Sequence, residues 1–318
     1  MGGHRALSVN TPAKFFPILI LTITLDKEYQ QIDQECLPAL GAKKQPPDFN
    51  ERQLGIQSWI LNRPVGPPLK IATGYLGKMG NAGSALETYI YLDRISPLFV
   101  FLCGIAGSLD PAKVHLGDVV VARSVDWWQL NKLSSETFAQ AYVIGDKFFR
   151  IHREPPLPCF STEFCGRLID QFVKNQANSG LLPSNHNDQI LRFKNQYGVT
   201  DNRIHMGDIV SWEYVLSDAV IRQDVFDRST GSLAIEMEGA GFTYALKRRC
   251  QEMQRLGRGH LLPSGFIFRG ISDLSARKDR EHKQWQSIAM FNAASAIVRF
   301  LNIFYDEMFL QGEESIAS

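Results

Sequence analysis

Runs of mostly apolar residues alternate with amphipathic stretches along this chain, and together they predict an α/β fold. Near-continuous apolar runs are typical of buried strands, because a strand covered on both faces has few polar positions. The predicted strands span residues 17–25, 56–61, 69–73, 97–103, 114–122, 204–216, 233–238 and 265–273. Apolar side chains at helical spacing predict helices over residues 28–40, 84–91, 161–178 and 283–309.

The predicted elements follow one another along nearly the whole chain, so we expect one domain over residues 15–310. Residues 1–14 are polar and are expected to form a flexible N-terminal segment, and residues 311–318 a loose tail. Prolines and a turn-rich stretch interrupt the pattern at about residues 153–203. We expect an insertion or lid there, which could close over a ligand or form an oligomer contact.

Two of the predicted strands end on acidic residues. One runs into Glu236 and Glu238 and is followed by a helix that opens on small residues, and the other ends on Ser272 and Asp273. In open α/β sheets, ligands bind at the carboxyl ends of the strands, where carboxylates can serve in acid–base chemistry or bind sugar hydroxyls. Alternatively, either acid could be solvated in a loop, and Asp273 could cap a helix or pair with Arg269.

The residues around these acids resemble the paired signature of the nucleoside phosphorylase and nucleosidase superfamily. The two parts are Ile235-Glu-Met-Glu-Gly-Ala240 and Arg269-Gly-Ile-Ser-Asp273, and the resemblance extends over residues 17–301. The methylthioadenosine/S-adenosylhomocysteine nucleosidases are the most similar members, and similar domains also act as nucleotide-degrading effectors in bacterial defence. The resemblance implies a three-layer α/β/α fold around a central mixed, partly barrel-like sheet.

The resemblance also implies roles for individual residues in cleaving a purine N-glycosidic bond. Asp273 would donate a proton to N7 of the base, with burial raising its pKa. Glu238 would accept hydrogen bonds from the ribose, and Glu28 would activate the attacking water, unless Glu28 is only an exposed acid in the first turn of a helix. The other expected substrate-binding residues are Met237, Glu236, Ile105, Ala106, Gly107, Val215, Leu216, Ser272 and Gly80.

Two further stretches bear on the expected pocket. Residues 74–83 carry a glycine at every third position, which either brings backbone close to phosphate or sugar oxygens or makes a tight turn, with Ser84 as a candidate helix cap. Their spacing matches neither a dinucleotide-binding motif nor a P-loop. Ser211-Trp-Glu213 replaces the Ser-Gly-Asp that is usual in the family, so Trp212 is expected to alter the pocket wall.

Hydrolysis is favoured over phosphorolysis by the charge of the first loop. A phosphorylase must hold a phosphate dianion, usually with arginines and backbone donors. The loop at residues 24–28 is net acidic, and residues 101–103 of the central strand include no arginine. A carboxylate where phosphate would bind suits water instead. A phosphate-dependent phosphorylase and a non-catalytic nucleoside-binding module are the alternatives, and the retained Glu238 and Asp273 argue against the second.

The group at the 5′ position of the substrate is left open by the sequence. A thioether, a hydroxyl or a phosphate chain could occupy that position. Lys27, Lys78, Arg123 and Arg153 are candidates for contacting phosphates, although each could equally be a solvated surface charge. Trp127 and Trp128 either line the pocket or pack in the core.

Composition and charge set limits on the remaining functions. A net charge of +1 gives no bulk attraction to nucleic acid or membrane, and we expect no membrane span. The five cysteines are scattered, which fits a reducing cytoplasm, and the histidines lack ligand spacing, so neither a metal nor another cofactor is expected. Members of the family that this chain resembles are commonly oligomers, so the resemblance also implies a dimer or larger homo-oligomer.

Overall fold

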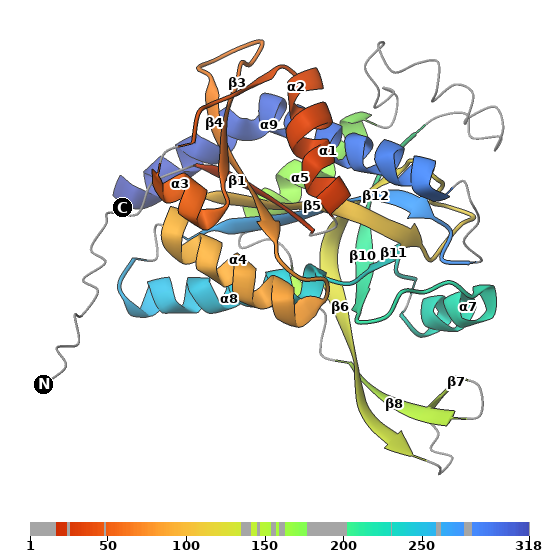
Figure 1. The fold of residues 1–318 in the computed structure, drawn as a ribbon. Coiled ribbons are helices and arrows are strands. Elements are labelled where there is room, and N and C mark those ends of the chain that lie inside the picture. The colour runs from red at the N-terminus through yellow and green to blue at the C-terminus, as the bar shows by residue number, and fades with distance from the viewer. Residues whose placement is uncertain are drawn as a thin grey trace, which may run out of the picture.

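The computed structural model places helices on both faces of a central mixed sheet (Figure 1). It describes residues 17–23, 26–47, 49–134, 141–144, 147–153, 157–158, 163–176, 202–229, 231–258, 262–276 and 282–317. The strands are β1 (Ile18–Ile23), β2 (Ala42–Lys44), β3 (Gln57–Leu61), β4 (Leu69–Leu76), β5 (Phe99–Ser108), β6 (Val119–Ser134), β7 (Ala141–Ile144), β8 (Lys147–Arg153), β9 (Leu157–Pro158), β10 (Ile204–Trp212), β11 (Ala234–Glu236) and β12 (Ser264–Asp273).

Five of these strands close on themselves. β5 pairs with β11, β11 with β10, β10 with β6, β6 with β12, and β12 again with β5. Parallel and antiparallel pairs both occur in this ring, and the remaining strands extend it through β1 and β4. The structure therefore confirms the expected mixed sheet with a barrel-like part.

The helices form two layers on either side of the sheet. They are α1 (Asp26–Gln31), α2 (Leu37–Ala39), α3 (Phe49–Leu54), α4 (Asn81–Ile95), α5 (Glu163–Gln176), α7 (Ala219–Arg228), α8 (Gly239–Arg255) and α9 (His282–Ala317), with a π-helical turn η1 (Ile32–Cys36). α4 and α8 cover one face, and α1, α5 and α9 cover the other (Figure 1). The expected three-layer architecture is thus confirmed.

A separate hydrophobic core lies on each face of the sheet. Successive side chains of a strand point to opposite faces, so Ile18 and Ile20 of β1 belong to the core under α9, and Leu19 and Leu21 to the core over α4 and α8. All four are buried. Burial on both sides explains why β1 appears in the sequence as an unbroken apolar run.

Within the stretch predicted as an insertion or lid, residues 153–203, the structure describes the helix α5. α5 packs on α9 and β10, and its Ile169 and Phe172 are fully buried in the core beneath α9. The amphipathic pattern correctly predicted a helix. Its apolar stripe, however, faces the core and not a ligand. Residues 177–201 lie outside the described part of the chain.

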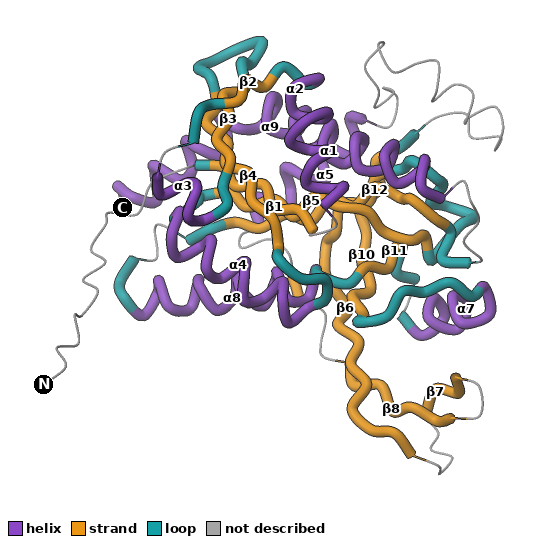
Figure 2. The backbone as a smooth tube through the Cα atoms, in the orientation of Figure 1, coloured by secondary structure: helices purple, strands orange, loops and turns teal. Residues whose placement is uncertain are grey.

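The segment that does project from the body is an arm formed by β6, β8 and β7 (Figure 2). The sequence predicted a strand over residues 114–122, whereas β6 begins at Val119 and continues to Ser134. Its last residues pair with β8, from Trp128 opposite Arg153 to Ser134 opposite Phe148, and β8 pairs in turn with β7. The arm is therefore a continuation of a core strand.

Two helix boundaries differ from those expected. α4 begins at Asn81, with Gly80 at a φ of 96° before it, so Ser84 lies inside the helix and does not cap it. α9 continues to Ala317 through most of the expected tail, because residues 311–317 include good helix formers and no proline. Residues 1–16 lie outside the described part of the chain.

α9 also contains an apolar stretch that is long enough to cross a membrane. Residues 285–307 have a mean hydropathy of 1.4, and 78% of that window is buried inside the protein. Among the described residues this is the one such helix. Packing in the core beneath the sheet accounts for its apolar character.

Candidate active site

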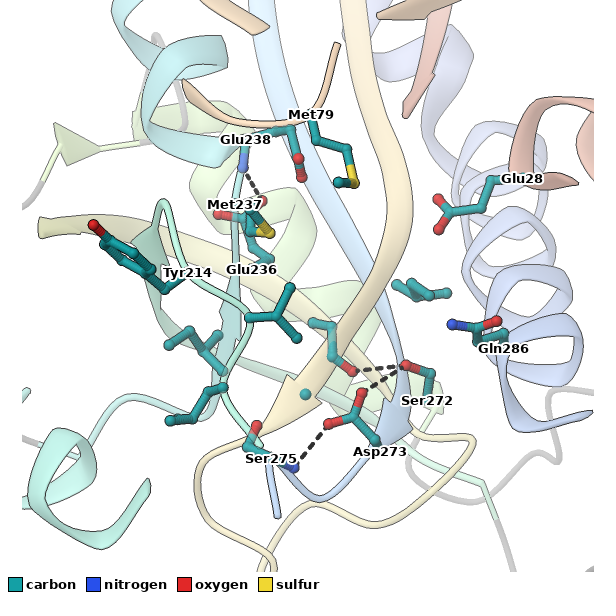
Figure 3. A pocket seen from close by; sticks show the side chains of 16 residues that line it. Glu28, Met79, Tyr214, Glu236, Met237, Glu238, Ser272, Asp273, Ser275 and Gln286 are labelled. Carbon is teal, nitrogen blue, oxygen red and sulfur yellow. Dashed lines mark hydrogen bonds between the residues drawn. The ribbon is translucent and has the colours of Figure 1, made fainter. Parts of the chain in front are cut away.

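The predicted acids meet in one pocket, which lies where β5, β11 and β12 end (Figure 3). The pocket is lined by Glu28, Met79, Ile105, Ala106, Gly107, Tyr214, Val215, Leu216, Ile235, Glu236, Met237, Glu238, Ser272, Asp273, Ser275 and Gln286. Every predicted site residue except Gly80 is in this set. Gly80 lies just behind the lining, where its backbone N–H donates to Glu238 Oε1 over 3.1 Å.

Glu236 and Glu238 are positioned by the turn between β11 and α8. The Glu236 carboxylate accepts hydrogen bonds from the backbone N–H groups of Glu238, at 3.0 Å, and Gly239, at 2.8 Å. It therefore satisfies free donors at the start of α8, where the helix dipole also favours a negative charge. This fixes the turn and directs Glu238 toward the pocket.

A fully buried arginine lies behind these two acids. Arg269 of β12 pairs with Glu236, and its Nη2 lies 3.5 Å from Glu238 Oε2. Because a buried charge is costly unless it is paired, the three residues depend on one another. Arg269 therefore neutralises buried carboxylates. It pairs with Glu236 and Glu238 and not with Asp273, the partner considered from the sequence.

Glu28 and Glu238 are buried acids whose pKa values are raised. Burial raises the pKa of Glu28 to about 8, with a further upward contribution from Glu238 and an opposing one from Arg269. Burial likewise raises the pKa of Glu238 to about 7, against the attraction of Arg269 and with repulsion from Glu236. Only 5% of the surface of Glu28 is exposed, so it is not a solvated helix acid.

Asp273 is held by its neighbours at the end of β12. Its Oδ1 accepts from the backbone N–H of Ser275 over 2.8 Å, and its Oδ2 lies 3.2 Å from the hydroxyl of Ser272. A register shift between Ile271 and Asp273 brings Asp273 opposite Gly107 of β5. The carboxyl is half-buried, so the full burial expected from the apolar strand is only partly present.

The pocket floor and wall come from the end of β5 and the turn after β10. Ile105, Ala106 and Gly107 lie at the end of β5, and Val215 and Leu216 follow β10. Trp212 does not form part of this wall. It is 2% exposed and packs on Trp128, with ring centroids 6.0 Å apart, and on the lining residue Tyr214, at 5.5 Å, so it can affect the wall only through Tyr214.

The remaining tryptophans and cations lie elsewhere. Trp128 is fully buried and Trp127 packs against a core cluster, so neither lines the pocket. Arg123 Nε lies 3.7 Å from Asp208 Oδ1, and Lys78 is exposed. Neither Arg123 nor Lys78 lines the pocket. The side chains of Lys27 and Arg153 lie outside the described part of the chain.

Five lining residues were not predicted from the sequence. Met79, Tyr214 and Ile235 are adjacent to predicted site residues, and that adjacency was an available signal. Ser275 lies two residues after Asp273. Gln286 has no local signal, because it reaches the pocket through the packing of α9 on α1, where Gln31 Nε2 donates to the backbone carbonyl of Ser287 over 2.9 Å.

No cluster of three or more histidine, cysteine, aspartate or glutamate side chains that could hold a metal ion occurs among the described residues.

The sequence matches one known family. A model of the phosphorylase superfamily matches residues 64–302, and the chain belongs to this superfamily. This confirms the resemblance found in the sequence.

Individual relatives are more distant. A death domain-containing ATP nucleosidase of Amphimedon queenslandica is 22% identical over 230 residues, which are 71% of this chain and 38% of that protein. The chain thus spans well under half the length of this relative.

Solved structures share the fold. The methylthioadenosine/S-adenosylhomocysteine nucleosidase of Colwellia psychrerythraea, in complex with adenine, superposes with a TM-score of 0.56 at 15% identity, covering 90% of this chain and 96% of that one. The futalosine hydrolase of Helicobacter pylori superposes with a TM-score of 0.52 at 18% identity, covering 91% and 97%.

Proposed function

We propose that this protein is a nucleosidase that hydrolyses the N-glycosidic bond of an adenine-type purine nucleoside or nucleotide and releases the free base. The observation that carries the proposal is that Glu28, Glu238 and Asp273, far apart in the sequence, line one pocket beside an apolar wall. Membership of the phosphorylase superfamily and the names of the relatives support the same reaction class.

The proposed reaction divides its work among the three acids. Cleavage passes through an oxocarbenium-like ribose, so it requires an acid for the leaving base and a nucleophile on the sugar. Asp273 protonates the base at N7 as the bond breaks. Glu28 takes a proton from water as the water attacks the ribose, and Glu238 accepts hydrogen bonds from the ribose hydroxyls. Met237 packs against the sugar.

Hydrolysis is supported by the charge of the pocket. Four carboxylates line it, those of Glu28, Glu236, Glu238 and Asp273, and none of the described lining residues is a lysine or arginine. Arg269 contacts Glu236 and Glu238 through its Nη2 and is not among the lining residues. An inorganic phosphate dianion would therefore meet repulsion where a neutral water would not.

The test is base release with and without phosphate. Wild-type protein is incubated with adenosine, methylthioadenosine, AMP and ATP, and free adenine is measured by chromatography. We expect adenine from at least one substrate, at the same rate in phosphate-free buffer and in about 50 mM phosphate. Phosphate at about that concentration saturates enzymes with ordinary KM values. Strict dependence on phosphate would instead establish a phosphorylase. Absence of base release from every purine substrate, with binding retained, would establish the binding module.

The raised pKa of Glu28 predicts the pH dependence. A general base must be ionised, and burial raises the pKa of Glu28 to about 8, so kcat/KM should rise with pH and level off above about 8. Ionisation of Glu238, with a pKa of about 7, adds to the rise. The measurement is kcat/KM between about pH 5.5 and 9.5 for wild type and Glu28→Gln.

The glutamine variant should lose about 10²-fold or more in kcat/KM and should no longer show the rise near pH 8. A wild-type profile that is flat from about pH 6 to 8, or a Glu28→Gln profile of unchanged shape, would contradict a base role for Glu28.

Assembly into dimers or larger oligomers and a role in antiviral defence remain predictions from the resemblance. A cytoplasmic location remains a prediction from the scattered cysteines.

A further inference from the structure

Ser275 is a pocket residue to which the proposed reaction assigns no role. It is fully buried, and among the described residues its hydroxyl oxygen has no hydrogen-bond partner. Its backbone is left-handed, with a φ of 49°, a conformation that only one other non-glycine residue of the described chain adopts, Ser96 at the end of α4. Both a left-handed serine and an unpaired buried hydroxyl are costly, and such features concentrate at ligand-binding sites.

The hydroxyl of Ser275 lies directly beside the Asp273 carboxyl. A Cβ placed on Gly107 would stand 2.1 Å from Ser275 Oγ and 2.8 Å from Asp273 Oδ1, so the two oxygens lie side by side above Gly107. The glycine leaves the space that both occupy. The Ser275 backbone N–H also donates to Asp273 Oδ1, which holds the backbone of Ser275 next to that carboxyl.

The position of Ser275 relative to the other acids determines which part of a purine it would face. Figure 3 shows Glu28 and Glu238 toward one end of the pocket and Ser275 at the opposite end, beyond Asp273. On a purine, N7 and the substituent at C6 share one edge. The ribose is attached on the other side of N7. If Asp273 is at N7 and the ribose is near Glu238, the next group along the edge, at Ser275, is the C6 substituent.

We propose that Ser275 is a specificity-determining residue whose hydroxyl hydrogen-bonds the C6 substituent of the purine base. This inference rests on the proposed function. A hydroxyl can both donate and accept, and it rotates to suit its partner. It accepts from the 6-amino group of adenine and donates to the 6-oxo group of hypoxanthine or guanine. The bound base thus supplies the partner that the buried hydroxyl lacks.

The experiment pairs a change in the protein with a change in the base. The substrates are the adenine, hypoxanthine and unsubstituted purine ribosides, each carrying the 5′ group that wild type cleaves best. Ser275→Ala removes only the hydroxyl. We expect kcat/KM to fall about tenfold for the 6-amino and 6-oxo substrates, as for one lost hydrogen bond, and to stay within about twofold for unsubstituted purine.

The unsubstituted purine riboside also shows whether the variant is folded. Ser275→Gly serves as a second variant, because glycine adopts a positive φ freely and removes the same hydroxyl. Both variants should give the same pattern across the three substrates.

An equal loss on all three substrates would overturn the inference and leave Ser275 as a residue that only positions Asp273. No loss on any substrate would overturn it as well. In both cases the wild type is an active nucleosidase, so the proposed function stands. If the wild type releases none of the three bases, the proposed function itself fails, and the inference fails with it.

Discussion

Replacing Asp273 with asparagine should reduce the rate of base release by about 10³-fold while leaving nucleoside binding within a few-fold of wild type. An amide has nearly the shape of a carboxyl and can still hydrogen-bond N7, but it cannot transfer a proton to the leaving base. The backbone N–H of Ser275 can donate to the amide oxygen, and the amide nitrogen can donate to the hydroxyl of Ser272. The rate is measured as free base under saturating substrate, and binding by calorimetry.

The matched control is Asp306→Asn. Asp306 lies on α9, is 56% exposed in its side chain, and pairs with Arg63 over 2.9 Å outside the pocket. Its replacement should change the rate by less than about twofold, because the Asp306 side chain is itself exposed and does not line the pocket. If Asp273→Asn keeps about a third or more of the wild-type rate, the group that protonates the leaving base is not Asp273.

Replacing Arg269 with methionine should lower the free energy of unfolding by about 3–5 kcal/mol. Methionine keeps much of the volume of arginine but leaves Glu236 and Glu238 buried beside no cation. Unfolding in urea at neutral pH, followed by circular dichroism, measures the loss. Base release should fall too, because the turn that carries Glu238 is held through the same pair.

Two further variants separate charge from packing. Arg228→Met removes one partner of an exposed ion pair with Asp224 on α7, and we expect it to cost no more than about 1 kcal/mol. Adding Glu236→Gln and Glu238→Gln to Arg269→Met removes the uncompensated charges and should restore much of the stability. A loss from Arg269→Met that is no larger than that from Arg228→Met would show that the buried charges are not coupled.

The convergence of the acids could be predicted because it depends on few physical rules. Carboxyl ends of parallel strands meet at one edge of a sheet, and this rule holds for β12 beside β5. β11 runs antiparallel to β5 and pairs only with its last residues, so the short strand still ends near the same place. Glu236 and Asp273 lie there together. The unbroken apolar run of β1 likewise followed from burial on both faces.

Features that depend on contacts between distant segments could not be predicted. Gln286 reaches the pocket only because α9 crosses α1, and nothing around residue 286 indicates this. The amphipathic pattern of α5 defines an apolar face but not what covers it, so the sequence does not distinguish a helix of the core from one over a ligand. Trp212 shows the same limit, since its side chain is buried against Trp128 and Tyr214 and does not itself line the pocket.

The arm formed by β6, β8 and β7 has a consequence for how the protein tolerates changes in length. β6 takes part in the closed ring up to Trp128, where it still pairs with Trp212 of β10, and only its later residues enter the arm. Added or deleted residues at the far end of the arm would therefore leave the register of the ring unchanged. At the turn between β11 and α8, by contrast, one inserted residue would separate Glu236 from the helix start that it caps and from Arg269.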